Sequence, residues 1–301
     1  MITTANHIDL KVHQFTTFLT FGITNRLDVS LAIPIANVRM GVFSTATVLH
    51  NDSPTRFRHA FPPRPGCPLV VSNPNNLADN SCLVSSFSNA SAASGIGDIT
   101  LRVKGTAWKG ERAAVSTGLD IRLPSGDELN FLGSGTVGFK PFVIWSYRSR
   151  ISPHAFVGYE VNGNSQIADI SAGKKTKLPG ELTYAAGADV WLTKRLTAAL
   201  DIVGQQVFQA QRTTRSTFQE PGECVDDPNT GIQCASEPAT PGPKDKTLVS
   251  STGSYNMSSL SVGAKFKPFS TLLITGNVLI RLNDAGLRYK PVPMVGIAYT
   301  F

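Results

Sequence analysis

Long runs of apolar residues are absent from this sequence of 301 residues. A membrane-spanning helix needs about 20 consecutive residues that are mostly apolar. The longest apolar stretches, such as residues 29–36, are soon interrupted by polar residues or proline. The sequence therefore predicts no membrane-spanning helix. It leaves open the strands of an outer-membrane β-barrel, because their hydrophobicity only alternates and averages out along the chain.

Histidine is scarce, and the common sequence motifs of hydrolytic enzymes are missing. The chain has five histidines, and it contains neither a GxSxG nor an HExxH motif. His154 lies two residues after Ser152 at the start of a strand pattern, but a nucleophile needs a base that a third group holds in place. His154 is better explained as a side chain that faces solvent or the interior of a barrel. We therefore expect no enzyme, and no cofactor or metal site.

The positive charge is not accompanied by the motifs of a nucleic-acid-binding protein. The formal net charge is +7. The sequence shows no helix-turn-helix, zinc-finger or RNP-like motif, and no basic helix with interleaved aromatic residues. We expect no nucleic acid as a partner. The surplus charge is then either scattered over the surface or placed to attract anions to a pore.

Cysteine is also rare, with four residues in two local pairs. Cys67 and Cys82 lie in one irregular segment, and Cys224 and Cys234 lie in another. Neither pair has the CxxC spacing of a zinc site, and no histidine completes a ligand set. The pairing predicts two loop-closing disulfides, Cys67–Cys82 and Cys224–Cys234, formed in an oxidising compartment. Four free thiols are the alternative.

Alternation of apolar and polar residues is the dominant signal. In residues 119–123, Asp120 and Arg122 alternate with three apolar residues. A helix would bury both charges beside the apolar side chains. A strand places both charges on one face and the apolar side chains on the opposite face. The same period of two recurs in residues 27–35, 99–104, 113–123, 137–145, 154–161, 182–190, 196–202, 260–266, 272–282 and 295–301. With a further segment near residues 15–21, the pattern predicts about eleven strands.

Short and long connections alternate between these predicted strands. The short links are residues 24–26, 109–111, 147–152, 193–195 and 268–270. The long connections are residues 46–95, 125–135, 163–180 and 209–254, with a shorter one near residues 284–288. Short periplasmic turns and long extracellular loops are the layout of an outer-membrane barrel. We therefore predict an all-β fold, an antiparallel up-and-down transmembrane β-barrel that forms one domain over residues 1–301.

The chain ends in a strand pattern that an aromatic residue closes. Val295, Ile297, Tyr299 and Phe301 share one face of the final segment VGIAYTF. A terminal phenylalanine on an alternating strand resembles the signature that the outer-membrane assembly machinery reads. We therefore expect that machinery as a partner of the strand ending at Phe301, and the bacterial outer membrane as the location. The C-terminus and the short links then lie on the periplasmic side, and the loops 46–95 and 209–254 are extracellular.

The first residues lack the pattern of a secretory signal. Residues 1–7 have no positive segment followed by an apolar one, and a strand pattern begins near Ile8. A barrel must be exported, and bacterial single-chain barrels have an even number of strands. We therefore expect that a signal peptide and a first strand precede this sequence, so that the full barrel has about twelve strands. An additional strand within residues 46–95 is the alternative.

Three segments of the sequence resemble a known family. They are GITNRLDVSLAIPI (residues 22–35), GIGDITLRVKG (residues 95–105) and LDIRLPSGD (residues 119–127). Within them, Gly97-Asp98 opens a strand, and Leu123-Pro124-Ser125-Gly126-Asp127 precedes an outer loop. From about residue 15 onwards the chain is similar to the outer-membrane transporter-like family named for the meta-pathway of phenol degradation. The resemblance implies a barrel with a role in the uptake of hydrophobic or aromatic compounds, and it implies no catalytic residues.

Charged and polar side chains occupy the strand face opposite the apolar one. We predict that they line the interior of the barrel, and they are Arg102, Lys104, Asp120, Arg122, Lys140, Glu160, Asp189, Asp201, Lys265, Asn277 and Arg281. In a barrel of about twelve strands, side chains can fill much of the interior. These residues form either a buried network of mutually satisfied charges or a polar constriction that selects solutes by charge and size.

Two functions are compatible with such a barrel. The first is a channel or transporter that passes small molecules, hydrophobic or aromatic ones included, across the outer membrane by passive diffusion. Its partners are membrane lipid and a small-molecule solute. The second is a structural or surface-interaction barrel with a plugged lumen and partner-binding loops. In both cases the lipid-facing residues include Val115, Leu119, Ile121, Val143, Trp145, Tyr159, Leu200 and Ile274.

Overall fold

The computed structural model describes residues 2–48, 58–59, 70–71, 84–168, 174–219, 244–285 and 290–301. The chain forms two compact units. Unit 1 comprises residues 1–20, 30–101 and 122–135, and unit 2 comprises residues 21–29, 102–121 and 136–301. Among the described residues, no helix has both the length and the apolar character that a membrane crossing requires.

Nearly all regular structure in the described residues is β-strand. The strands are β1 (Ile2–Thr24), β2 (Leu27–Val48), β3 (Arg58–His59), β4 (Val70–Val71), β5 (Val84–Ile96), β6 (Thr100–Lys109), β7 (Ala113–Arg122), β8 (Gly138–Tyr147), β9 (Ile151–Asn162), β10 (Asn164–Ser165), β11 (Thr176–Lys177), β12 (Gly180–Trp191), β13 (Leu196–Gln219), β14 (Lys244–Phe269), β15 (Leu272–Arg281) and β16 (Val292–Tyr299), and a short 3-10 helix, η2, spans Gln166–Ala168. The main sheet has the order β1-β2-β6-β7-β8-β9-β12-β13-β14-β15-β16, and β5 also pairs with β2. Successive long strands are neighbours, so the predicted all-β, antiparallel up-and-down order is confirmed.

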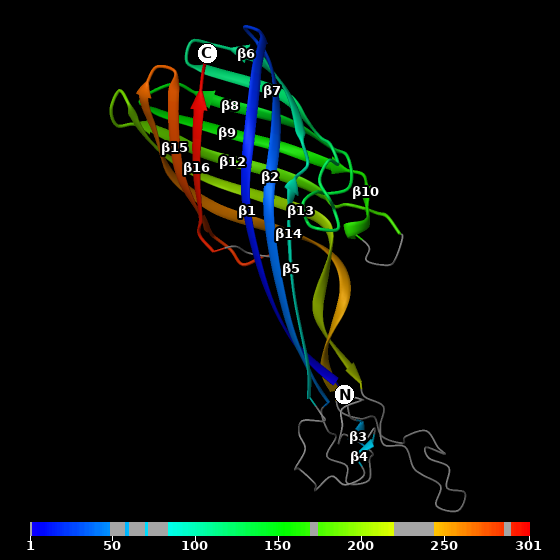
Figure 1. The fold of residues 1–301 in the computed structure, drawn as a ribbon. Coiled ribbons are helices and arrows are strands. Elements are labelled where there is room, and N and C mark those ends of the chain that lie inside the picture. The colour runs from blue at the N-terminus through cyan, green and yellow to red at the C-terminus, as the bar shows by residue number, and fades with distance from the viewer. Residues whose placement is uncertain are drawn as a thin grey trace, which may run out of the picture. The chain divides into compact units, whose positions relative to one another are not determined.

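Unit 2 contains a curled antiparallel meander from β8 to β16 (Figure 1). The register of its strands places side chains of the same face in rows across the sheet, because successive residues of a strand point to opposite faces. Gly187 of β12, for example, lies between His154 of β9 and Asp201 of β13. Side chains from strands on either side of Gly187 can therefore meet across it.

Unit 1 contains an antiparallel pair formed by β2 and β5. Residues 35–47 of β2 pair with residues 84–96 of β5. At the break between β5 and β6, the Gly97 N–H donates to the Pro34 carbonyl at 2.8 Å, so that pairing with β2 continues into β6. The structure thus contains a strand, β5, at the end of this predicted connection, but β5 pairs with β2 off the main strand order and adds no neighbour to it. That a further strand precedes this sequence stays a prediction.

Short and long connections alternate as the sequence predicts. Short links join β1 to β2, β6 to β7, β8 to β9, β12 to β13 and β14 to β15, whereas longer segments separate β2 from β5, β7 from β8, β9 from β12, β13 from β14 and β15 from β16. In unit 2, the meander brings these short links to one end of the strands, which we call the short-link end.

Three strands are longer than the sequence pattern indicates, and β5 lies where the pattern indicates a connection. We predicted connections at residues 46–95 and 209–254, but β2 continues to Val48, β5 begins at Val84, β13 continues to Gln219 and β14 begins at Lys244. One of these added lengths, the segment AQRTTRSTFQ that ends β13, carries polar residues on both faces. Ladder hydrogen bonds join backbone groups and do not require an apolar face, so pairing continues where the alternation ends.

The strands of unit 2 expose many large apolar side chains. Four of the eight residues predicted to face lipid are strongly exposed, with Val143 at 44%, Trp145 at 40%, Tyr159 at 42% and Leu200 at 53%. The other four, Val115, Leu119, Ile121 and Ile274, are partly exposed. Further exposed members of the set are Phe139, Val157, Val161, Ile202, Val262, Phe266, Val278, Ile280, Val295, Ile297 and Tyr299. Monomeric soluble proteins rarely expose apolar surface on this scale.

Candidate functional site

Four charged side chains of alternating sign form a ladder across β6, β7, β8 and β9. Arg102 donates two hydrogen bonds to Asp120, from Nε to Oδ1 at 2.6 Å and from Nη2 to Oδ2 at 2.8 Å. Lys140 Nζ then lies 3.9 Å from Asp120 Oδ2 and 3.4 Å from Glu160 Oε2. The two carboxylate side chains are only 5% and 12% exposed. A carboxylate this poorly hydrated needs a cationic partner, and each of these has one.

An aromatic pair lies against the charged ladder. The Phe142 side chain is 2% exposed, and the Arg102 guanidinium carbon lies 4.8 Å from the centre of its ring. The ring of Phe156, from the neighbouring strand, is 5.7 Å away from that of Phe142. A guanidinium over a ring face gains a cation–π interaction. The charged face is therefore closely packed at β6 to β9.

A second interaction on this face spans an intervening strand. His154 Nε2 of β9 lies 2.7 Å from Asp201 Oδ1 of β13, and Gly187 of β12 lies between them. A Cβ atom on Gly187 would lie 2.1 Å from Asp201 Oδ1 and 2.3 Å from the Leu200 carbonyl oxygen. The His154–Asp201 contact therefore requires glycine at position 187, because any side chain there would occupy the space between the two residues.

Two further ion pairs join strands of unit 2. Lys265 Nζ of β14 reaches across β13 to Asp189 Oδ2 of β12 at 2.6 Å. Lys104 Nζ of β6 lies 3.0 Å from Asp28 Oδ2 of β2, where both side chains are about one-third exposed. Glu181 of β12 and Gln205 of β13 are also hydrogen-bonded to each other. Charges on this face are thus mostly balanced by opposite charges on nearby strands.

The structure brings seven of the eleven predicted interior residues into ion pairs across strands. They are Arg102, Lys104, Asp120, Lys140, Glu160, Asp189 and Lys265. Asp201 contacts His154 across β12, and Arg122 pairs with Asp98 in the segment before β6. Arg281 instead pairs with Asp284, three residues along the chain, at 3.4 Å. Asn277 lies against Gly263, where a Cβ would be 1.8 Å from Asn277 Oδ1. That these residues line a pore stays a prediction.

Several partners of these residues were not among the predicted set. Asp28, Asp98, Glu181 and Gln205 all make contacts on the charged face or next to it. Continuing the alternation of β12 one step back from Leu182 would have found Glu181. Asp98 lies in an irregular segment before β6, where no strand pattern assigns it a face.

In unit 1, Asp98 holds the connection between β7 and β8. Its carboxylate accepts hydrogen bonds from Gly126 N at 3.1 Å and from Ser134 N at 2.7 Å, as well as from the Ser134 hydroxyl. Arg122 Nη1 lies 3.6 Å from Asp98 Oδ2. We call this set of contacts the loop clasp. It ties residues at both ends of the connection to one buried carboxylate.

Ser125 completes the loop clasp from the other side. Its hydroxyl donates to the Gly97 carbonyl at 2.8 Å and accepts from Ile99 N at 2.8 Å. The two motifs that resemble a family, Gly97-Asp98 and Leu123 to Asp127, thus meet in space. Asp127 itself is fully exposed, and a hydrogen bond from the Asn130 side chain lowers the pKa of its carboxyl. The motifs act as structural elements that fix a loop.

The predicted disulfides lie outside the described residues. Cys67, Cys82, Cys224 and Cys234 all fall in segments that the structure does not describe, so both pairings stay predictions. Across the part of the chain that is described, no group of three or more His, Cys, Asp or Glu residues is placed to hold a metal ion.

Comparisons with known proteins give one family match. The profile of the family described as "MetA-pathway of phenol degradation" matches residues 13–221. No curated protein matches the sequence. Among solved structures, the ferric-catecholate import receptor Fiu from E. coli K12, in its open form, is similar to the chain with 11% identity and a TM-score of 0.31. That match covers 96% of this chain, and the chain spans 40% of the length of the receptor.

Proposed function

This chain belongs to the family described as "MetA-pathway of phenol degradation", and we propose that it is an outer-membrane channel or transporter that passes small molecules by passive diffusion. Hydrophobic or aromatic compounds are the solutes that the family description suggests. The observation that carries the proposal is the division of the meander into two faces. Large apolar side chains are exposed on one face, while the other pairs its charges across strands.

A lipid bilayer explains both faces together. An apolar surface on the outside of a strand array is stable in hydrocarbon, and charges on the opposite face are stable where they meet water or each other. Alternating short and long connections support the same arrangement. In that arrangement the short links lie on the periplasmic side, and the charged face borders the path that a solute takes.

A structural barrel with a plugged interior is the second candidate. The close packing of Phe142, Phe156 and Arg102 favours it, because these side chains fill space next to the charged ladder. In that case the ion pairs stabilise the barrel, and the loops carry the function by binding partners.

Conductance of the refolded chain in a planar lipid bilayer separates the two candidates. The channel proposal predicts discrete current steps in salt solution, and vesicles containing the chain should take up a small neutral aromatic alcohol faster than protein-free vesicles. Vesicles containing a heat-inactivated sample provide the control. Correctly folded chain that gives neither current steps nor faster uptake would contradict the channel and support the plugged barrel.

A further inference from the structure

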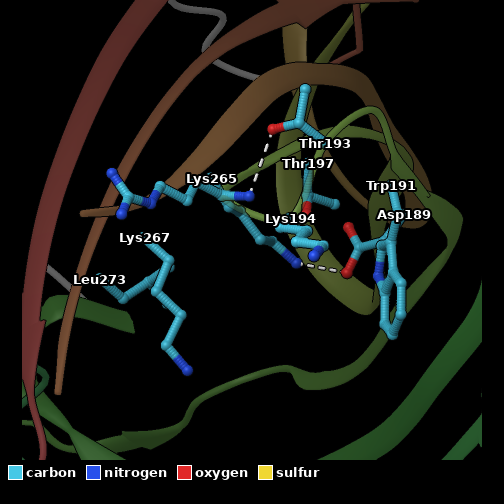
Figure 2. A pocket seen from close by; sticks show the side chains of 9 residues that line it. Asp189, Trp191, Thr193, Lys194, Thr197, Lys265, Lys267 and Leu273 are labelled. Atoms are coloured by element: carbon cyan, nitrogen blue, oxygen red, sulfur yellow. Dashed lines mark hydrogen bonds and ion pairs between the residues drawn. The ribbon is translucent and has the colours of Figure 1, made fainter. Parts of the chain in front are cut away.

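A cavity at the short-link end of unit 2 is surrounded by positive charge (Figure 2). Its volume is about 480 Å³, which is within the range of small-molecule sites. The cationic side chains that line it are Lys194, Arg195, Lys265 and Lys267, together with the carboxylate of Asp189. The family profile ends at residue 221, so Lys265 and Lys267 lie beyond the matched region.

Three of the four cations carry surplus charge. Lys265 is neutralised by Asp189, whose Oδ2 lies 2.6 Å from Lys265 Nζ, as Figure 2 shows. Among the described residues, no carboxylate forms an ion pair with Lys194, Arg195 or Lys267. The ladder of β6 to β9 is balanced, whereas this cavity is not. An anion that enters the cavity therefore meets cations that have no competing partner.

The backbone around the cavity is held in a defined geometry. The Thr193 hydroxyl accepts hydrogen bonds from Arg195 N at 3.2 Å and from Leu196 N at 3.0 Å, which fixes the turn between β12 and β13. Lys267 N donates to the Arg195 carbonyl at 2.8 Å, so the start of β13 is also tied to β14. Arg195, directly before β13, and Lys267 of β14 are thus held next to each other at the edge of one cavity.

The wall of the cavity also has an apolar part. Trp191 and Leu273 belong to the lining, and the Trp191 side chain is labelled on the Asp189 side of the cavity in Figure 2. An inorganic anion would bind to the cationic side chains and leave this apolar wall in contact with water. A small carboxylate with a flat apolar body would use both, since the indole ring offers a surface for stacking.

We propose that this cavity binds small aromatic carboxylates, with the carboxylate at Arg195 and Lys267 and the ring against Trp191. The inference rests on the proposed function for its role, which is to hold an anionic solute at the short-link end of the path. Binding itself does not depend on conduction. A chain that binds benzoate without conducting would overturn the proposed function alone.

Fluorescence of Trp191 tests the site directly. The full chain is refolded in detergent micelles with Trp108 and Trp145 replaced by Phe, which leaves Trp191 as the only reporter among the three tryptophans. Benzoate, benzyl alcohol and sulfate are titrated separately at constant ionic strength. We expect saturable quenching by benzoate, with an affinity about tenfold higher than for either of the other two probes. Benzyl alcohol lacks the negative charge that the cations bind, and sulfate lacks the aromatic ring that contacts Trp191.

Matched variants assign the binding to the named cations. Arg195→Gln with Lys267→Gln should weaken benzoate binding about tenfold. Lys109→Gln, which removes an exposed charge from the end of β6, should leave it unchanged. Lys267→Gln alone serves if the double variant does not fold. Absence of saturable quenching, equal binding of benzyl alcohol or sulfate, or an equal loss in the Lys109 variant would each overturn the proposal.

Discussion

At the scale of single residues, the charged face depends on small side chains where longer ones cross a strand. Gly187→Ala places a Cβ 2.1 Å from Asp201 Oδ1 and 2.3 Å from the Leu200 carbonyl oxygen, so the backbone or the His154–Asp201 contact must shift. We expect the free energy of unfolding in phospholipid vesicles to fall by about 1–3 kcal/mol. At Gly276 a Cβ meets no atom within 4 Å, so Gly276→Ala should be nearly neutral. Equal losses in urea titrations of the two variants would contradict this.

Burial decides how much each charge of this face contributes to stability. Asp120→Leu removes the carboxylate that Arg102 and Lys140 share, and we expect a loss of about 3 kcal/mol in the free energy of unfolding. Asp28→Leu breaks a pair whose side chains are both about one-third exposed, and it should cost less than about 1 kcal/mol. Urea titration of the two variants in vesicles gives the comparison. A larger loss for Asp28→Leu would show that burial does not govern these pairs.

At the scale of whole elements, the sequence predicts strands well only where the two faces differ. The segment LDIRL predicts β7 because its charges and apolar residues alternate. The strand β5 and the far ends of β13 and β14 carry polar residues on both faces, so no pattern marks where pairing begins or stops. The interior residues follow from the same alternation. Which of these residues pair with each other does not follow from the alternation. The ion pair of Lys265 in β14 with Asp189 in β12, for example, reaches across the intervening strand β13.

The connection between β7 and β8 is held in place by hydrogen bonds to the side chain of Asp98. Asp98→Ala leaves Gly126 N and Ser134 N without their shared acceptor. We expect amide hydrogen exchange in residues 123–137 to accelerate about tenfold, while exchange in β7 and β8 stays unchanged. Asp127→Ala, which removes a fully exposed carboxylate from the same loop, is the control and should have a smaller effect. Unchanged exchange in the Asp98 variant would rule out the loop clasp.

At the scale of the whole molecule, the account depends on one face of the meander meeting lipid. Two tryptophans of unit 2 report on the two faces. Trp145 alternates with Lys140 and Phe142 along β8 and is 40% exposed, whereas Trp191 shares the face of Asp189 along β12. Exposure alone does not distinguish them, because Trp191 is 52% exposed. The account predicts that the Trp145 side chain is exposed to lipid and the Trp191 side chain to the interior of the barrel.

Quenching by brominated phospholipids measures this difference directly. Chains that retain only Trp145 or only Trp191, with the other tryptophans replaced by Phe, are refolded into vesicles with and without bromine on the acyl chains. We predict that brominated lipid strongly quenches the fluorescence of Trp145 and only weakly that of Trp191, because a lipid-facing ring contacts the acyl chains. Equal quenching of both, or stronger quenching of Trp191, would contradict a membrane-spanning sheet with an apolar outer face and a charged inner one.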